Sequence, residues 1–220
     1  MIVHLQKESI PFNKSEVLRY LGYKQGKNIL DEKTNRIIDT EFKKALEIIK
    51  PVGIYKTYSI DEFPIKLSGK HIKNHLKNSE GLILLTVTIG SKIDKAITEK
   101  FNEGKYTEGV VLDAIATELV EACADLFTEN LQNKFSEFNF TSRFSPGYGD
   151  WHLNVQPKII KELEAYRIGI SVSDSMFLIP RKTITAVIGI TKNQTHLENH
   201  NCSRCFFKGC IYRKRVETIQ

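Results

Sequence analysis

The spacing of apolar residues predicts several helices in this chain. Residues 107–134 carry apolar side chains at intervals of three and four, which is the period of an amphipathic helix. Residues 38–49 show the same period, and Pro51 is expected to end that helix because proline lacks a backbone N–H. Ser91 is expected to cap a further helix, with Asp94 at its third position. Shorter helices are predicted at residues 15–21, 69–76 and 158–166.

Other segments have the pattern of strands. Residues 81–90 form a short apolar run, partly β-branched, that is typical of a buried strand. Residues 168–180 and 183–190 are expected to be two strands joined as a hairpin around residues 180–182. Extended segments are also predicted at residues 1–5 and 52–60. Because the elements follow no regular β-α-β order, we expect an α+β fold, with a mixed or antiparallel twisted sheet flanked by helices.

The composition is typical of a folded globular chain. Its 220 residues suffice for one large domain or two small ones, and 41% of them are apolar. We expect an N-terminal α/β portion, residues 1–80, packed on a main domain, residues 81–192. A basic, cysteine-containing tail follows at residues 193–220.

The start of the chain and the length of its apolar runs bear on localisation. The first eight residues lack the basic and apolar regions of a secretory signal. The longest apolar run, residues 81–87, is too short to span a bilayer. We therefore expect a soluble cytoplasmic protein without a membrane partner. The formal net charge of +6 favours acidic partners only weakly and does not establish nucleic-acid binding.

Three cysteines of the tail, Cys202, Cys205 and Cys210, have a spacing that suits metal ligands. Three thiolates could bind an iron–sulfur cluster with an outside fourth ligand. They could instead bind zinc together with a histidine of the tail. The alternative is three reduced thiols without a metal. Cys123 lies on the long predicted helix and is expected to be a small core residue.

The loop at residues 141–151 carries the strongest chemical signal in the sequence. Arg143 offers a guanidinium fork that suits a carboxylate, and two glycines allow close approach of the backbone. The loop also offers two aromatic faces, which suit a planar base or a sulfonium cation. The loop lacks the third glycine of a dinucleotide-binding fingerprint. The alternative is a structural turn in which Arg143 pairs with a surface acid.

This loop resembles a known one. Its Arg-x-x-Pro-Gly-Tyr motif, residues 143–148, is similar to the S-adenosylmethionine-binding loop in the activation domain of cobalamin-dependent methionine synthases. Residues 112–122 resemble the long helix of that family, and residues 168–175 resemble its next strand. Glu137 matches a family acid. The resemblance covers roughly residues 91–190, in the same order along the chain.

The resemblance implies a module that binds S-adenosylmethionine outside any Rossmann fold. In that family the module remethylates cobalamin that has been oxidised to the inactive cob(II) state, with an electron from a flavodoxin-like donor. The 220 residues include no cobalamin domain. The implied role is therefore reactivation, in trans, of a separate corrinoid-dependent methionine synthase that lacks its own activation domain, so that S-adenosylmethionine binds here and the partner supplies cobalamin.

The resemblance also implies the ligand contacts. Arg143 would hold the methionyl carboxylate, and the backbone at two loop positions would lie against the ligand. Carboxylates would accept hydrogen bonds from the amino group or the ribose, or offset the positive sulfonium. No catalytic acid or base is implied, because the cofactors carry the chemistry. The implied ligand-binding residues are Glu121, Glu137, Arg143, Ser145, Gly147 and Tyr148.

Some features do not follow the family pattern. The aromatic N-terminal segment that supplies an aspartate to the ligand in that family has no match here, and residues 10–13 read Ile-Pro-Phe-Asn instead. His71 and His75 lie one helical turn apart but lack a third ligand nearby in the sequence, so we expect them at the surface. One alternative function is a non-catalytic module that docks a corrinoid protein or binds S-adenosylmethionine in another methyl-transfer pathway. A metal-dependent nucleic-acid-binding protein is a further alternative, which only the tail supports.

Overall fold

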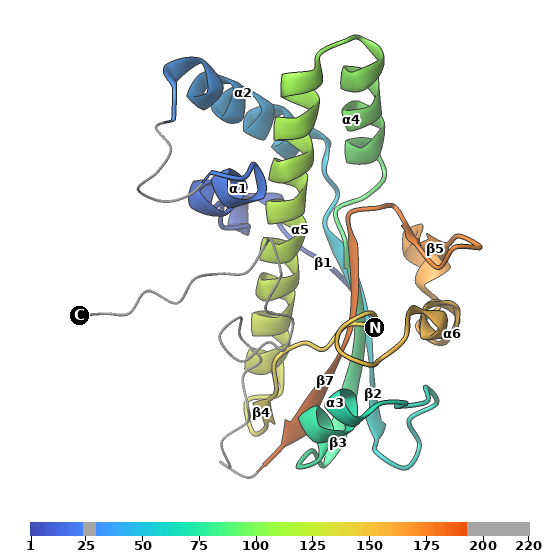
Figure 1. The fold of residues 1–220 in the computed structure, drawn as a ribbon. Coiled ribbons are helices and arrows are strands. Elements are labelled where there is room, and N and C mark those ends of the chain that lie inside the picture. Colours follow the sequence, from blue (N-terminus) through green and yellow to red (C-terminus); the bar gives the residue numbers. More distant parts are fainter. Residues whose placement is uncertain (24–29, 193–220) are drawn as a thin grey trace.

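The computed structural model describes residues 1–23 and 30–192, and it is built on a five-stranded antiparallel sheet (Figure 1). The strand order is β1-β2-β3-β7-β4, and every neighbouring pair is antiparallel. Every residue of the central strand β3 is buried. The sheet therefore has both of its faces covered. Its strands are β1 (Ile2–His4), β2 (Val52–Ser59), β3 (Gly81–Thr88), β4 (Asn139–Phe140) and β7 (Thr183–Thr191).

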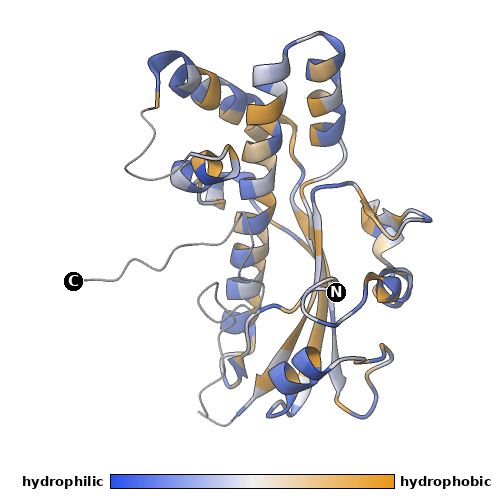
Figure 2. Ribbon diagram, in the orientation of Figure 1, coloured by the Kyte–Doolittle hydropathy of each residue, from blue (hydrophilic) through white to orange (hydrophobic). Residues whose placement is uncertain are grey.

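The two faces of the sheet carry separate cores because successive side chains of a strand point to opposite sides. Ile83, Leu85 and Val87 of β3 belong to one core, whereas Leu82 and Leu84 belong to the other. Hydrophobic residues accordingly recur along the strands at the centre of the sheet in Figure 2. The apolar run that predicted a buried strand reflects this burial on two sides.

The larger core lies between the sheet and a helical layer that Figure 1 shows on one side of it. Its main element, α5, packs against the other three helices of the layer and against two strands. Because α5 has neighbours on several sides, fourteen of its residues are buried. The helices of this layer are α1 (Lys14–Tyr20), α2 (Glu32–Ile48), α4 (Lys92–Asn102) and α5 (Tyr106–Lys134).

The opposite face of the sheet is covered by short elements and loops. Trp151, at 0% exposure, and Phe144, at 1%, fill this second core. A small two-stranded sheet, β5–β6, stands at its edge. The described elements outside the five-stranded sheet and the helical layer are η1 (Lys7–Ser9), α3 (Lys70–Leu76), η2 (Leu153–Val155), α6 (Gln156–Glu162), η3 (Ala165–Ile168), β5 (Ser171–Val172) and β6 (Leu178–Ile179).

The α+β prediction with a sheet flanked by helices is confirmed, and the sheet is antiparallel. The predicted hairpin between residues 168–180 and 183–190 is wrong. Residues 168–180 break into η3, β5 and β6, and β6 pairs with β5, while β7 pairs with β3 and β4. Short-range alternation cannot distinguish a strand that pairs with its neighbour in sequence from one that crosses to a distant partner.

One predicted helix start differs from the structure, whereas α4 begins directly after Ser91, as predicted, with Asp94 at its third position. The helix predicted at residues 15–21 begins at Lys14, and Asn13 caps it, since its side chain accepts hydrogen bonds from the backbone N–H groups of Ser15 and Glu16. Ser91 makes no capping hydrogen bond at the start of α4. Asp94 of that helix instead accepts a 2.7 Å hydrogen bond from the backbone N–H of Arg181.

The predicted boundary near residue 80 lies between α3 and β3, and β2 pairs with β3 across it along the full length of both strands. Residues 1–80 therefore contribute two strands to the common sheet. Within the described residues, no helix combines the length and the apolar character that crossing a membrane requires.

Gly53 of β2 tests how closely α5 packs on the sheet. A Cβ atom at this position would overlap the ring of Phe127, which is fully buried. Overpacking of this kind costs about 1–3 kcal/mol, so we expect Gly53→Ala to lower the free energy of unfolding by that amount in urea denaturation. Phe127→Leu makes room for the methyl group, so the double variant should lose less stability than the sum of the two single variants. Strict additivity would contradict this contact.

Candidate functional site

The loop at residues 141–151 is held to the sheet at its start. The backbone N–H of Phe144 donates to the carbonyl of Val187, and the N–H of Val187 donates back to Phe144, both at 2.9 Å. Nε2 of His75 lies 2.8 Å from the carbonyl oxygen of Ser142. Because these contacts fix the backbone on both sides of Arg143, they set the direction in which its side chain leaves the loop.

The end of the loop is held to α3. The carboxylate of Asp150 accepts hydrogen bonds from the backbone N–H groups of Lys70, at 2.6 Å, and His71, at 3.1 Å. Burial opposes the charge of Asp150, but these hydrogen bonds outweigh it and lower the pKa of the carboxyl group. Gly69, with φ of 138°, is needed where the two segments meet, since a Cβ there would overlap the Asp150 carboxylate.

The middle of the loop is a tight turn around Gly147. Its φ is 91°, a conformation that favours glycine, and its N–H donates to the carbonyl of Trp151 at 2.6 Å. The Trp151 ring is fully buried, and its Nε1 donates to the carbonyl of Lys66 at 3.3 Å. Tyr148, by contrast, is 53% exposed beside the turn. Trp151 therefore anchors the loop in the core, while Tyr148 lies at the surface.

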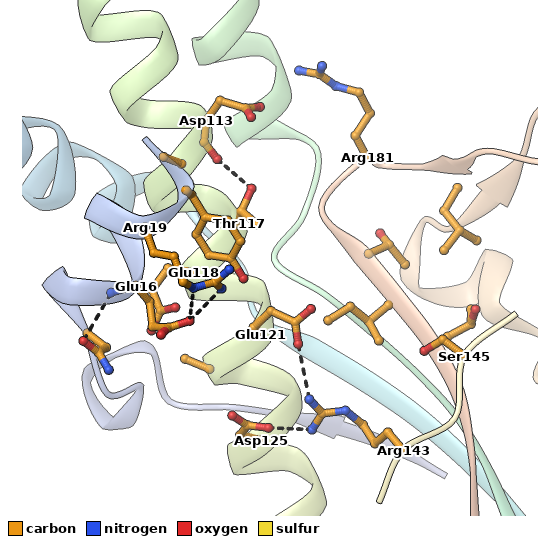
Figure 3. A pocket seen from close by; sticks show the side chains of 18 of the residues that line it. Glu16, Arg19, Asp113, Thr117, Glu118, Glu121, Asp125, Arg143, Ser145 and Arg181 are labelled. Carbon is orange, nitrogen blue, oxygen red and sulfur yellow. Dashed lines mark hydrogen bonds and ion pairs between the residues drawn. The ribbon is translucent and has the colours of Figure 1, made fainter. Parts of the chain in front are cut away.

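Arg143 reaches across from this loop to α5 (Figure 3). Its Nη1 lies 2.8 Å from Oδ1 of Asp125, and its Nη2 lies 3.3 Å from Oε2 of Glu121. Nη1 also lies 3.3 Å from Oγ1 of Thr128. The Arg143 side chain is only 17% exposed, whereas Glu121 and Asp125 are 41% and 72% exposed. The positive group is fixed and its two acidic partners remain accessible.

These residues line a large cleft between α5 and the loop. Its volume is about 2370 Å³, and α1 and α4 also contribute to it. The acidic side chains that line it are Glu16, Asp113, Glu118, Glu121 and Asp125, and the lysine and arginine side chains are Lys14, Arg19, Arg143 and Arg181. Among the described residues, five carboxylates and four cations line the cleft, so this part of the lining is slightly acidic, although the whole chain carries a net charge of +6.

The wall formed by α1 could not be predicted from the sequence. Nε and Nη2 of Arg19 donate to Oε2 of Glu16 at 3.1 and 2.7 Å, and the guanidinium lies 4.3 Å from the centre of the Tyr20 ring. The pKa of Tyr20 is raised to about 12, first because burial disfavours the phenolate and then because the Glu121 carboxylate lies near. Helix α1, from the first half of the chain, therefore forms a wall of the cleft opposite the loop.

The end of the cleft remote from Arg143 is held together by Lys182. Its Nζ lies 2.9 Å from Oδ1 of Asp113, and it donates to the Asp113 carbonyl at 3.1 Å and to Oγ1 of Thr117 at 2.8 Å. The Lys182 side chain is only 11% exposed. These contacts fix the start of β7 against α5. Arg181, the residue before it, is 58% exposed at this end of the cleft (Figure 3).

The structure places most of the predicted site residues together. Glu121, Arg143, Ser145, Gly147 and Tyr148 all line the cleft. Glu137 does not: it is exposed in the turn between α5 and β4 and is not among the residues that line the cleft.

The two histidines of α3 are not simply surface residues. His71 lines the cleft, and both His71 and His75 are half-buried against the loop. A sequence offers no signal for such contacts, because α3 precedes the loop by about 70 residues.

The metal prediction on Cys202, Cys205 and Cys210 lies outside the described residues and stays a prediction. Within the described residues, 1–23 and 30–192, no group of three or more histidine, cysteine or acidic side chains could hold a metal ion. Cys123 is fully buried on α5, and burial raises the pKa of its thiol to about 12. The prediction that Cys123 is a core residue is confirmed.

Comparison with known proteins shows a likeness in fold and none in sequence. No family model matches the sequence, and no curated protein sequence matches it. Among solved structures, the fold is similar to that of the MetH reactivation domain bound to AdoHcy, with a TM-score of 0.59 and 13% identity. The alignment covers 89% of this chain and 79% of the other. The fold is therefore that of a methionine synthase activation domain, as the resemblance of the loop implied.

The half-buried position of Tyr20 beside Glu121 predicts a pH dependence. Folding raises the pKa of this phenol from 10.0 to about 12, so the stabilisation is fully present below pH 10 and is lost as the pH rises to 12. We expect Tyr20→Phe to flatten the fall in the free energy of unfolding over this interval, measured by urea denaturation at stepped pH. If the curves of the variant and the wild type were parallel from pH 10 to 12, the phenol would not be buried beside Glu121.

Proposed function

We propose that the cleft binds S-adenosylmethionine and that the protein presents its methyl group to cobalamin held by a separate corrinoid-dependent methionine synthase. The observation that carries this proposal is the position of Arg143. On a fold shared with a domain solved with S-adenosylhomocysteine, the loop fixes this guanidinium against two carboxylates of α5. S-adenosylhomocysteine is what S-adenosylmethionine becomes when it gives up its methyl group.

The charges around Arg143 suit an α-amino acid group. A guanidinium binds a carboxylate through two parallel hydrogen bonds, and the exposed partner Asp125 can be displaced from it at little cost. Glu121, which faces the same cleft, can then accept hydrogen bonds from the ammonium group. One cation beside two anions therefore matches the zwitterion at the methionyl end of the ligand.

The remaining lining suits the rest of the ligand. S-adenosylmethionine carries a net positive charge because of its sulfonium, and five carboxylates of the described part of the chain line the cleft. The ring of Tyr148, which is half exposed beside the loop, offers a face on which a sulfonium can rest. These features favour a cationic ligand over an anionic nucleotide, for which an excess of basic groups would be expected.

The size of the cleft leaves room for a second reactant. Sites for small molecules usually measure about 300–1,000 Å³, whereas this cleft measures about 2370 Å³. An open cleft lets the methyl acceptor approach while another protein carries it. The sulfonium supplies the methyl group, and an electron donor of the flavodoxin type supplies the reducing electron. The residues of this chain bind and orient, and neither a general acid nor a general base is required.

Loss of the Arg143 guanidinium should weaken binding strongly. We expect Arg143→Ala to reduce the affinity for S-adenosylmethionine about 10- to 100-fold, because it removes a charge-assisted hydrogen-bonded pair from a half-closed site. Isothermal titration calorimetry measures this directly. Arg167→Ala removes an exposed arginine that does not line the cleft, and it should bind as the wild type does. If the wild type bound no S-adenosylmethionine at millimolar concentration, the proposal would be wrong.

An assay of methyl transfer to a separate protein distinguishes a reactivation module from a module that only binds S-adenosylmethionine. A corrinoid-dependent methionine synthase without an activation domain should regain methylcobalamin when this protein, S-adenosylmethionine and a reductant are added together. The optical spectrum of the corrinoid reports the conversion. Arg143→Ala should slow it at limiting S-adenosylmethionine. Tight binding of S-adenosylmethionine without any methylation of the partner would favour the alternative, a non-catalytic module of another methyl-transfer pathway.

A further inference from the structure

We infer that the backbone of β7 at Thr183 and Thr185 binds the base of the ligand, so that the site selects adenine. The N–H of Thr185 donates to N1 of the base, and the carbonyl of Thr183 accepts from its 6-amino group. This contact rests on the proposed function, because it requires S-adenosylmethionine in the cleft. It adds a contact to the base, which the resemblance of the loop does not supply.

The backbone groups of β7 point alternately toward its two sides. The N–H and the carbonyl of Val187 both face the loop, where they pair with Phe144 at 2.9 Å. Thr185 and Thr183, two and four positions earlier on the strand, therefore turn their own backbone groups to the same side, away from β3. Both threonines line the cleft. The N–H and carbonyl groups of this strand edge thus point toward the space that the ligand occupies.

The loop leaves this part of the edge without a neighbouring strand. If the pairing at Phe144 continued, Pro146 would lie opposite Thr185, and proline has no N–H to donate. Gly147 then turns the chain away, with φ of 91°. Strand β4 pairs with β7 only at the far end of that strand. In the part of the chain that the structure describes, no strand or loop segment therefore pairs with the edge at Thr183 and Thr185.

The side chains of the two threonines hold this edge in place. Oγ1 of Thr185 donates to Oε1 of Gln156, and Oγ1 of Thr183 donates to Oγ1 of Thr88, both at 2.9 Å. Thr183 and Thr185 are only 8% and 2% exposed. Their backbone groups are therefore fixed in surroundings that exclude most water. A hydrogen bond from such a group to a ligand is stronger than one at the surface.

The level of this edge along α5 suits the base of the ligand. Lys182, directly before β7, contacts α5 at Asp113, whereas Arg143 contacts it at Glu121. An α-helix rises about 1.5 Å per residue, so these two contacts lie about 12 Å apart along α5. In Figure 3, β7 runs opposite α5 from one of these levels toward the other. An extended S-adenosylmethionine with its carboxylate at Arg143 therefore brings its base to the start of β7.

Adenine presents the groups that this edge requires. Its 6-amino group donates, its N1 accepts, and the two lie side by side. On a strand edge, the carbonyl of Thr183 and the N–H of Thr185 point the same way, so together they accept and donate. Hypoxanthine and guanine reverse this order, since their O6 accepts and their N1 donates. Ile97 of α4 and Ala114 of α5, which also line the cleft, offer apolar surface for the faces of the base.

Isothermal titration calorimetry with two base-modified ligands tests this contact. The first probe is S-adenosylmethionine with carbon in place of N1, and the second lacks the 6-amino group. We expect the wild type to bind S-adenosylmethionine about 10- to 100-fold more tightly than either probe. Thr185→Pro removes the N–H at an edge position, where proline is tolerated. This variant should no longer distinguish S-adenosylmethionine from the first probe. It should still discriminate against the second, because the carbonyl of Thr183 remains.

Thr185→Val is the matched comparison, because it loses the hydroxyl group and keeps the N–H. It should retain both preferences, whatever its overall affinity. If the wild type bound all three ligands equally, the edge would not bind the base and the inference would be wrong. That comparison holds even if Thr185→Pro does not fold, because it uses the wild type alone. A folded Thr185→Pro that kept both preferences would also contradict the contact. Absence of S-adenosylmethionine binding to the wild type would instead overturn the proposed function, and the contact with it.

Discussion

The ion pairing of Arg143 with Glu121 and Asp125 is the contact around which the cleft is organised. It joins the loop at residues 141–151 to α5, the longest of the described helices, so two walls of one cleft meet at a single guanidinium. The pairing is possible only because the loop is fixed on both sides. Paired backbone hydrogen bonds between Phe144 and Val187 hold its start, and the Asp150 cap on α3 holds its end. A mobile loop would lose the entropy of ordering each time Arg143 met its partners.

The burial of α5 is what allows a functional face on this helix. Three other helices and the sheet cover most of its circumference, and the remaining stripe carries the carboxylates that face the cleft. Packing on several sides keeps α5 from moving relative to the loop, because a close-packed interior resists small shifts. At the far end, the buried ammonium of Lys182 ties β7 to Asp113 and Thr117 of the same helix. The cleft therefore has rigid walls at both ends.

Local chemistry was predictable from the sequence and long-range pairing was not. The helical period of α5, the buried run of β3 and the loop at residues 141–151 each depend on nearby residues, and the structure has all three. The predicted hairpin failed because β7 crosses to β3, about 100 residues earlier in the chain. Glu137 was matched to a family acid by its distance from Arg143 along the chain, yet it lies outside the cleft because the chain turns between α5 and β4. Arg19 and Tyr20 had no chemical signal in the sequence, since only the fold brings α1 opposite the loop.

The account makes one claim on which the rest depends: that the cleft between α5 and the loop receives an S-adenosyl amino acid with its carboxylate at Arg143. A crystal structure of the protein grown with S-adenosylmethionine tests this claim most directly. We predict electron density for the ligand along α5, with its carboxylate within hydrogen-bond distance of the Arg143 guanidinium and Asp125 displaced from it. Density for the ligand elsewhere on the protein, with the Arg143–Asp125 pair intact, would contradict the account.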